Sequence, residues 1–239
     1  GMMSMDPITG HVKAYVGGIN YKHFKYDHVM VGKRQAGSTF KPFLYSLAMQ
    51  EGYSPCYEIP NVPVVFEKEQ WGLEDDWIPK NSDDKYEGLL LSMKFALANS
   101  INTVTTYIMK QFGPHAVVSL ARKMGITSHL SAAPSICLGT FDLSVYEMVG
   151  AYSTFANKGV WTEPIIVTRI EDKNGVLLEE FSPQTREAMS AQTADLMVRM
   201  LQGVVDGVEN PDDRTKKGTG VRLRFKYQFE NEIGGKTGT

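Results

Sequence analysis

Apolar residues recur at helical spacing over several stretches of the chain. Between residues 38 and 50, Phe40, Phe43 and Leu47 fall at the intervals expected for one face of a helix. Pro42 is compatible with this helix because it lies in the first turn, where backbone N–H groups lack intrahelical partners. Similar patterns predict five further helices, over 89–98, 102–112, 114–124, 143–157 and 190–208.

Alternating apolar and polar residues, together with turn residues, predict strands near both ends of the chain. Asp-Pro-Ile-Thr-Gly at 6–10 and Asp-Lys-Asn-Gly at 172–175 are both turn sequences, so each predicts a hairpin between its flanking strands. The predicted strands are 2–5, 12–16, 165–170, 176–181 and a last one from about residue 233 to the chain end.

The remaining stretches are polar and predict irregular structure. Residues 19–37 and 209–220 are expected to be loops, and 53–87 a long connection with one short strand over 62–66. Connections of this length inside a domain are usually functional. Strands near both ends with helices between them predict an α/β fold of the α+β type, with an antiparallel sheet and a large helical subdomain.

Composition and charge narrow the class of protein. The 239 residues are 42% apolar and 22% charged, which excludes a disordered chain, and the net charge of −2 gives no basic patch for nucleic acid. No apolar stretch is long enough to cross a bilayer. The five histidines show no metal-ligand spacing, so no metal site is expected. Cys56 and Cys137 are interpreted as unpaired thiols, although the sequence leaves their pairing open.

Ser38 and Lys41 form a Ser-x-x-Lys motif at the start of the first predicted helix. Their spacing places both side chains on one face. Serine needs a base to become a nucleophile, and lysine can be that base when burial or a second cation lowers its pKa. A helix cap is the simpler interpretation of this motif taken alone. A second match, at Ser82 and Lys85, lies in a polar acidic loop and is interpreted as chance.

Two other short motifs carry polar side chains suited to catalysis. Ser-Ile-Asn at 100–102 lies between two predicted helices, and Lys-Thr-Gly-Thr at 236–239 lies on the last predicted strand. Strand alternation places Lys236 and Gly238 on one face, and a glycine lets a substrate backbone approach closely. Taken singly, the first motif could be a pair of helix caps and the second a polar tail.

In combination the three motifs form a known signature. They occur in the order and at the spacing (62 and 136 residues between their first members) of penicillin-binding proteins and class A β-lactamases. The chain resembles the transpeptidase domain of class A (bifunctional) penicillin-binding proteins along nearly its whole length. Further resemblance lies in segments 4–10, 16–18, 33–43, 77–81, 96–102, 151–159, 218–220 and 234–239.

The resemblance implies a role for each motif residue. Ser38 would attack the penultimate D-Ala carbonyl of a peptidoglycan stem peptide, and Lys41 would take its proton. Ser100 would relay a proton to the leaving amine, and Asn102 would hold Lys41 and the substrate amide. Lys236 would lower the pKa of Lys41 by charge repulsion.

The end of the chain is implied to bind substrate. Thr237 would help to bind the substrate carboxylate beside Gly238, and the backbone N–H groups of Ser38 and Thr239 would form the oxyanion hole. The expected ligands are D-Ala-D-Ala stem peptides and β-lactams, without any metal or organic cofactor. Nucleic acid is not an expected partner.

The resemblance also implies a larger parent protein. We expect one partial transpeptidase domain over 1–239, divided near 1–37, 38–160 and 161–239, whose sheet is incomplete because the chain ends at the Lys-Thr-Gly strand. The parent would carry a glycosyltransferase domain and a membrane anchor. It would act at the outer face of the cytoplasmic membrane with cell-wall synthesis partners, whereas this piece alone is expected to be soluble.

Three alternatives remain open from the sequence. A β-lactam hydrolase needs a glutamate that activates water, and neither Glu147 nor Glu163 lies in the expected context. A D,D-carboxypeptidase would share the acyl-enzyme but transfer it to water. A non-catalytic scaffold or penicillin sensor would bind without turnover.

Overall fold

The computed structural model describes residues 1–238, which form two compact units of interleaved chain. The first unit holds 1–34, 121–128 and 142–194, and the second holds 35–120, 129–141 and the chain from residue 195 onward. These ranges differ from the contiguous stretches 1–37, 38–160 and 161–239 expected from the sequence. Grouping the whole chain as one domain therefore stays a prediction.

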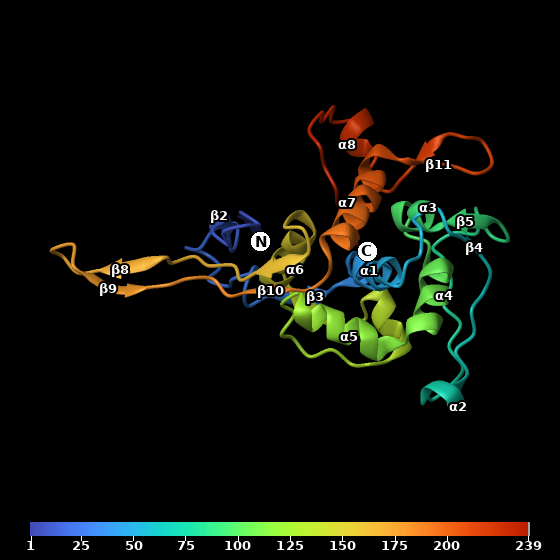
Figure 1. The fold of residues 1–239 in the computed structure, drawn as a ribbon, viewed down its shortest axis with the longest axis horizontal. Coiled ribbons are helices and arrows are strands. Elements are labelled where there is room, and N and C mark those ends of the chain that lie inside the picture. Colours follow the sequence, from blue (N-terminus) through green and yellow to red (C-terminus); the bar gives the residue numbers. More distant parts are fainter. Residues whose placement is uncertain (239) are drawn as a thin grey trace. The chain divides into compact units, whose positions relative to one another are not determined.

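Pairs of short antiparallel strands and one helix build the first unit (Figure 1). The elements are β1 (Met2–Met5), β2 (Val12–Val16), β6 (Asp142–Ser144), α6 (Val145–Ala156), β7 (Val160–Thr162), β8 (Arg169–Glu171), β9 (Leu177–Glu180) and β10 (Thr185–Glu187). β1 pairs with β2, β7 with β10, and β8 with β9. Both hairpins predicted from the sequence are confirmed.

The first hairpin turns where its sequence predicts it. Asp6 Oδ1 accepts hydrogen bonds from the backbone N–H groups of Ile8 (2.9 Å) and Thr9 (3.0 Å). Gly10 closes the turn at a φ of +74°, a conformation that glycine adopts at little cost. The Asp6 side chain thus replaces backbone partners that a tight turn leaves unpaired.

α6 begins at a capping box built on Ser144 and Glu147, in which each side chain accepts a hydrogen bond from the other residue's backbone N–H. The helix predicted over 143–157 is confirmed, but residues 143 and 144 belong to β6, and Ser144 is the residue that caps the helix. Glu147 is buried and also accepts hydrogen bonds from Thr127 and Ser128. This carboxylate therefore joins the start of α6 to the 127–128 loop.

The second unit is mainly helical. Its elements are a 3₁₀ turn η1 (Gly37–Phe40), α1 (Lys41–Gln50), β4 (Glu58–Pro60), α2 (Lys68–Trp71), β5 (Leu90–Ser92), α3 (Met93–Ala98), α4 (Asn102–Phe112), a 3₁₀ turn η2 (Pro134–Leu138), β11 (Val208–Glu209), β12 (Lys216–Lys217) and α8 (Arg222–Phe225). β3 (Lys33–Gln35), α5 (Pro114–Lys123) and α7 (Ala191–Asp206) each contribute residues to both units. The helices predicted at 102–112, 114–124 and 190–208 are confirmed to within two residues at each end.

Aromatic and aliphatic side chains of α1 and α4 form the core of the second unit. Phe40 and Phe43 stack with ring centroids 4.3 Å apart, and neither is exposed to solvent. Val104 and Ile108 of α4 are equally buried, on the helix that packs against α1. Burial of side chains of this size stabilises a domain by roughly 2 kcal/mol each. The two motif-bearing helices are therefore held together rigidly.

Two sequence predictions are wrong, one in the long connection and one directly after it. The strand expected over 62–66 lies instead at β4, which pairs with β5, and the helix expected from residue 89 begins only at Met93. Ile59 and Leu91 lie opposite each other in this ladder and are both buried. The pairing of these two buried side chains across the ladder, rather than the helical spacing of the apolar residues, thus decides the structure of residues 90–92. Ser92 then caps α3, because its side chain accepts a hydrogen bond from the Phe95 N–H.

The strand predicted from about residue 233 is also wrong for the described residues. Residues 233–238 form no strand, since no strand of residues 1–238 pairs with them. Gly235 N–H instead donates to the Leu201 carbonyl of α7 (3.1 Å). No helix within residues 1–238 is long and apolar enough to cross a membrane.

Candidate active site

Ser38 lies in the 3₁₀ turn η1, directly before α1, and is partly exposed. The Lys41 backbone N–H donates to the Ser38 carbonyl. Residues three apart in a 3₁₀ turn are almost eclipsed, so the Ser38 and Lys41 side chains leave the backbone on the same edge. The Ser-x-x-Lys spacing therefore brings the two residues to one edge of the turn, as the sequence predicts.

Two glycines fix the turn that carries Ser38. Gly37 has a φ of +53° and its N–H donates to the Gly139 carbonyl (3.0 Å). Gly139 also has a positive φ (+71°), and a Cβ there would lie 2.2 Å from the Gly37 carbonyl oxygen. Only a residue without a side chain fits at such a distance. The end of η2 thus supports the backbone just before Ser38.

Lys41 is fully buried, yet its ammonium has three acceptors. Its Nζ donates to the Ser100 carbonyl (2.6 Å), to Ser100 Oγ (3.2 Å) and to Asn102 Oδ1 (2.6 Å). These acceptors satisfy the three N–H groups of a charged lysine. Residues 59 and 61 positions apart in the sequence therefore share one hydrogen-bonded cluster.

Lys236 reaches the same hydroxyl from the other end of the chain. Its Nζ donates to Ser100 Oγ (2.9 Å) and to the Thr237 carbonyl (2.9 Å). Ser100 Oγ thus lies between two ammonium groups, and none of the described carboxylates forms a salt bridge with either lysine. Two cations without a countercharge destabilise each other's charged state.

Burial shifts both lysine pKa values downwards, and charge repulsion adds to the shift of Lys41. Burial, and then the charge of Lys236, lower the pKa of Lys41 from 10.5 to about 7. Burial lowers the pKa of Lys236 to about 8. Cys137 is a buried neighbour of Lys41, but burial raises the pKa of this thiol to about 12, so at neutral pH it offers Lys41 no negative charge.

The Lys-Thr-Gly segment contacts both other motifs. Thr237 Oγ1 donates to Thr219 Oγ1 (2.7 Å), and Thr219 N–H donates to the Ala98 carbonyl at the end of α3 (2.9 Å). Gly238 lies against Thr39, the neighbour of Ser38, because a Cβ on it would be 2.8 Å from Thr39 Cγ2. Thr239, expected in the oxyanion hole, lies outside the described residues.

The structure does not join every expected pair. Among residues 1–238, no hydrogen bond links Ser38 Oγ to Lys41 or to Ser100. All three Lys41 donors are engaged elsewhere, so this arrangement matches the charged form of the lysine. The second Ser-x-x-Lys match behaves as expected for chance, since Ser82 lies exposed in a loop.

Sequence reasoning missed several residues that support the site. Lys80 and Asn81 bond to Asn102, and Thr219 bonds to Thr237. Their segments, 77–81 and 218–220, belong to the family resemblance, which was the available signal. No side-chain spacing links them to the motifs, because each approaches from a distant part of the chain.

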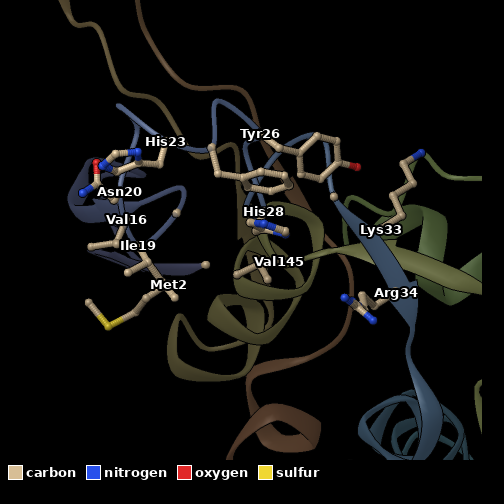
Figure 2. Close-up of a pocket in the computed structure, with 14 residues that line it drawn as sticks. Met2, Val16, Ile19, Asn20, His23, Tyr26, His28, Lys33, Arg34 and Val145 are labelled. Carbon is tan, nitrogen blue, oxygen red and sulfur yellow. The ribbon is translucent and has the colours of Figure 1, made fainter.

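The first unit contains a cavity of its own. Its volume is about 850 Å³, and its lining belongs entirely to the first unit (Figure 2). Figure 2 shows His23 towards one end of it, Arg34 towards the other, and Tyr26, His28 and Val145 between them. None of the three motifs contributes to this lining. No group of three or more possible metal ligands occurs among residues 1–238.

A family model described as the penicillin binding protein transpeptidase domain matches residues 1–239. The chain belongs to the penicillin-binding protein transpeptidase family. It is 32% identical to penicillin-binding protein 1A of Aquifex aeolicus over 238 residues, and 34% identical to penicillin-binding protein 2D of Bacillus subtilis over 208 residues. These alignments cover 100% and 86% of this chain. The chain spans only 30% of the length of either relative.

Solved structures agree with this assignment. The transpeptidase domain superposes on penicillin-binding protein 1A from Haemophilus influenzae with a TM-score of 0.87, 25% identity and 99% of this chain covered, against 39% of that chain. PonA1 from Mycobacterium tuberculosis in complex with penicillin V gives a TM-score of 0.72 and 25% identity, covering 85% of this chain and 55% of that one. The predicted family and fold class are confirmed.

Proposed function

We propose that this transpeptidase domain works through a Ser38 acyl-enzyme formed with the D-Ala-D-Ala end of a peptidoglycan stem peptide. The observation that carries the proposal is that two lysines donate to Ser100 Oγ. One is the fully buried Lys41, which follows the 3₁₀ turn of Ser38, and the other is Lys236. Such a pair supplies a lysine that is partly neutral at physiological pH, as a base for serine must be.

Acylation begins with proton removal from Ser38. With a pKa of about 7, Lys41 is unprotonated in a large fraction of molecules at neutral pH. A neutral amine has one N–H fewer and one free lone pair, so the lysine can accept the Ser38 proton. Ser38 Oγ attacks the carbonyl carbon of the penultimate D-Ala, and its proton passes to Lys41 Nζ.

Ser100 is arranged to protonate the leaving group. Its oxygen accepts hydrogen bonds from Lys41 and Lys236, which occupies both lone pairs and leaves its own proton free to be donated. That proton goes to the departing D-Ala amine as the C–N bond breaks, and Lys41 Nζ passes the proton it took from Ser38 to Ser100 Oγ. The enzyme is then an ester of Ser38, with its protons balanced.

Transfer repeats these steps in reverse. The amine of a second stem peptide attacks the ester carbonyl, Ser38 Oγ leaves and regains a proton, and a new amide joins the two peptides. One amide is exchanged for another, so no energy source is required. Lys236 and the Thr237 hydroxyl are positioned at an exposed edge of the cluster, where they would bind the substrate carboxylate with Gly238.

β-Lactams are the expected inhibitors of this site. The solved structure of PonA1 contains penicillin V, and that chain has the same fold. We further propose that a longer parent protein carries a glycosyltransferase domain and a membrane anchor, and works with cell-wall synthesis partners at the outer face of the bacterial cytoplasmic membrane. The relatives that extend well beyond this domain support this proposal.

A β-lactam hydrolase is disfavoured by the state of its candidate bases. Both Glu147 carboxylate oxygens accept hydrogen bonds, from Thr127, Ser128 and Ser144. Burial alone would raise the pKa of Glu147, but these bonds outweigh it and hold the pKa at about 2. A carboxylate so engaged is a poor base for water. Glu163 Oε2 accepts from Gln184 N–H (3.2 Å) in the same unit.

Labelling with a fluorescent penicillin tests the nucleophile. The wild-type chain should become covalently labelled, and Ser38→Ala should not. Ser82→Ala is the matched control, because it removes the serine of the second Ser-x-x-Lys sequence and should keep the label. Label that survives Ser38→Ala would refute the assignment.

Product analysis separates transpeptidation from its alternatives. With a D-Ala-D-Ala peptide and an acceptor amine, a transpeptidase forms the cross-linked amide, whereas a carboxypeptidase releases D-Ala without it. Rapid β-lactam turnover would indicate a hydrolase. A label that forms without any D-Ala release would indicate a sensor.

A further inference from the structure

We propose that Asn81 is a positioning residue that presents Asn102 to Lys41. Asn102 is both a motif residue and the first residue of α4. Its place at a helix start leaves its own backbone N–H, and that of Thr103, without intrahelical partners. The preceding residue, Ile101, is apolar and provides no side-chain cap. Something outside the helix must therefore satisfy these groups.

Asn81 supplies that cap from 21 residues upstream. Its Oδ1 accepts hydrogen bonds from Asn102 N–H (2.8 Å) and from Thr103 N–H (3.1 Å). Helix caps usually come from the residue directly before the helix. Here the cap comes from the long connection over 53–87, which gives that connection a function at the site.

The neighbouring residue sets the direction of the Asn102 amide. Asn102 Nδ2 donates to the Lys80 carbonyl (2.8 Å), while Oδ1 accepts from Lys41 Nζ (2.6 Å). A flipped amide would turn its NH₂ group towards the ammonium and its oxygen towards a carbonyl, so both contacts would become repulsive. Residues 80 and 81 together hold the backbone and the side chain of Asn102.

Asn81 is itself fixed by buried groups. Its Nδ2 donates to Asn61 Oδ1 (3.0 Å) and to Thr103 Oγ1 (3.1 Å). Asn61 is buried and anchored in turn, because its Nδ2 donates to the Tyr86 carbonyl (2.6 Å). Buried, fully paired polar networks of this kind restrict their members to one arrangement. The network runs unbroken from Tyr86 to Lys41.

This inference rests on the proposed function, since the reaction of Ser38 is what Asn102 serves. Within residues 1–238, Asn81 forms no hydrogen bond with Lys41 or with Ser38, so it acts on the reaction only through the start of α4 and Asn102. Misplacing a group near the chemistry slows a reaction more than it weakens substrate binding. Loss of Asn81 should therefore reduce the rate of acylation at saturating penicillin more than the affinity of the first, non-covalent complex.

The test compares Asn81→Ala, Asn81→Asp and the control Asn157→Ala in the 239-residue chain. Asn157→Ala likewise removes side-chain hydrogen bonds of an asparagine, to the Val160 carbonyl and Thr162, but in the first unit. We expect Asn81→Ala to lower the acylation rate constant for a fluorescent penicillin about tenfold, with the non-covalent dissociation constant little changed. Asn81→Asp keeps the acceptor oxygen for the two amides but loses the donor to Asn61, so it should restore only part of the rate.

Amide hydrogen exchange measured by NMR provides a readout independent of catalysis. The Asn102 and Thr103 amides should lose protection in Asn81→Ala and keep more of it in Asn81→Asp, which retains the acceptor oxygen. Unchanged acylation and protection in Asn81→Ala would overturn the proposal, as would an equal rate loss in Asn157→Ala. A wild-type chain that is never labelled would refute the proposed function instead, and the exchange result would still decide whether Asn81 holds the start of α4.

Discussion

At the scale of single residues, the chemistry depends on where Lys41 is placed. A lysine in water has a pKa near 10.5 and is almost never a base at pH 7. Complete burial beside Lys236 lowers its pKa to about 7, while three acceptors keep the charged form tolerable inside the protein. The same environment thus makes the lysine reactive without leaving an unpaired buried charge.

The pH dependence of acylation follows from these shifts. The rate should rise as pH increases through about 7, since only neutral Lys41 can accept the Ser38 proton, and fall above about 8 as Lys236 loses its charge. In Lys236→Gln the repulsion is gone, the pKa of Lys41 is higher, and the rising limb should move to higher pH. Stopped-flow acylation by a penicillin between pH 5 and 10 measures both limbs. A flat profile from pH 6 to 9 would contradict this account.

The two cysteines should differ sharply in reactivity. Both are free; Cys56 is exposed, whereas Cys137 is buried with a raised pKa of about 12. Only the thiolate reacts with an alkylating reagent, so iodoacetamide at pH 8 should modify Cys56 and leave Cys137 unmodified in the folded chain. Mass spectrometry of Cys56→Ser should then show no adduct until the protein is denatured. Rapid alkylation of that variant in its native state would show that Cys137 is not sealed from solvent.

At the scale of elements, Gly139 is the point where η2 supports the Ser38 turn. Gly139→Ala would place a methyl group against the Gly37 backbone as well as forcing alanine into a left-handed conformation. Gly175→Ala is the matched control, with a φ of +82° but no atom within 4 Å of the added Cβ. The control should cost about 1 kcal/mol of unfolding free energy.

Gly139→Ala should cost about 2 kcal/mol more, because the clash adds to the strain, and should also slow acylation. Urea unfolding followed by circular dichroism measures both variants. Equal losses of unfolding free energy in the two variants would mean that the close contact between Gly37 and Gly139 does not affect stability.

Glu147 should stabilise the start of α6 in a pH-dependent way. Its folded pKa of about 2 lies below the ordinary 4.5, so its contribution is present above pH 4.5 and is lost as pH falls towards 2. Glu147→Gln should lower the unfolding free energy at pH 7 by about 3 kcal/mol, since buried donors lose a charged acceptor. Glu179→Gln, an exposed site on β9, should change it by less than about 0.5 kcal/mol. Similar losses in both variants at pH 7, or the same loss for Glu147→Gln at pH 3, would argue against this role.

The elements predicted well are those whose signals are local. The bounds of α4 follow from its apolar spacing and from Gly113 at its end, and the first hairpin follows from Asp6 and Gly10. The strand misplaced to 62–66 depends on a partner 30 residues away in β5, which no local pattern contains. Pairing across the chain is the information that periodicity alone lacks.

At the scale of the whole molecule, three motifs separated by 62 and 136 residues meet at one hydroxyl, that of Ser100. Their order and family resemblance predicted this meeting. The supports from Lys80, Asn81 and Thr219 could not be derived by spacing, because they bond through backbone groups as much as through side chains. Motif chemistry is therefore readable from the sequence, whereas the contacts that position it require coordinates.

The most direct test of the account is to map the penicillin adduct by mass spectrometry of the digested chain. We expect one added acyl group, on the peptide that contains Ser38, and we expect it to be lost in Lys41→Met, where the base is gone but the serine remains. An adduct on any other residue, or undiminished acylation of Ser38 in Lys41→Met, would contradict it.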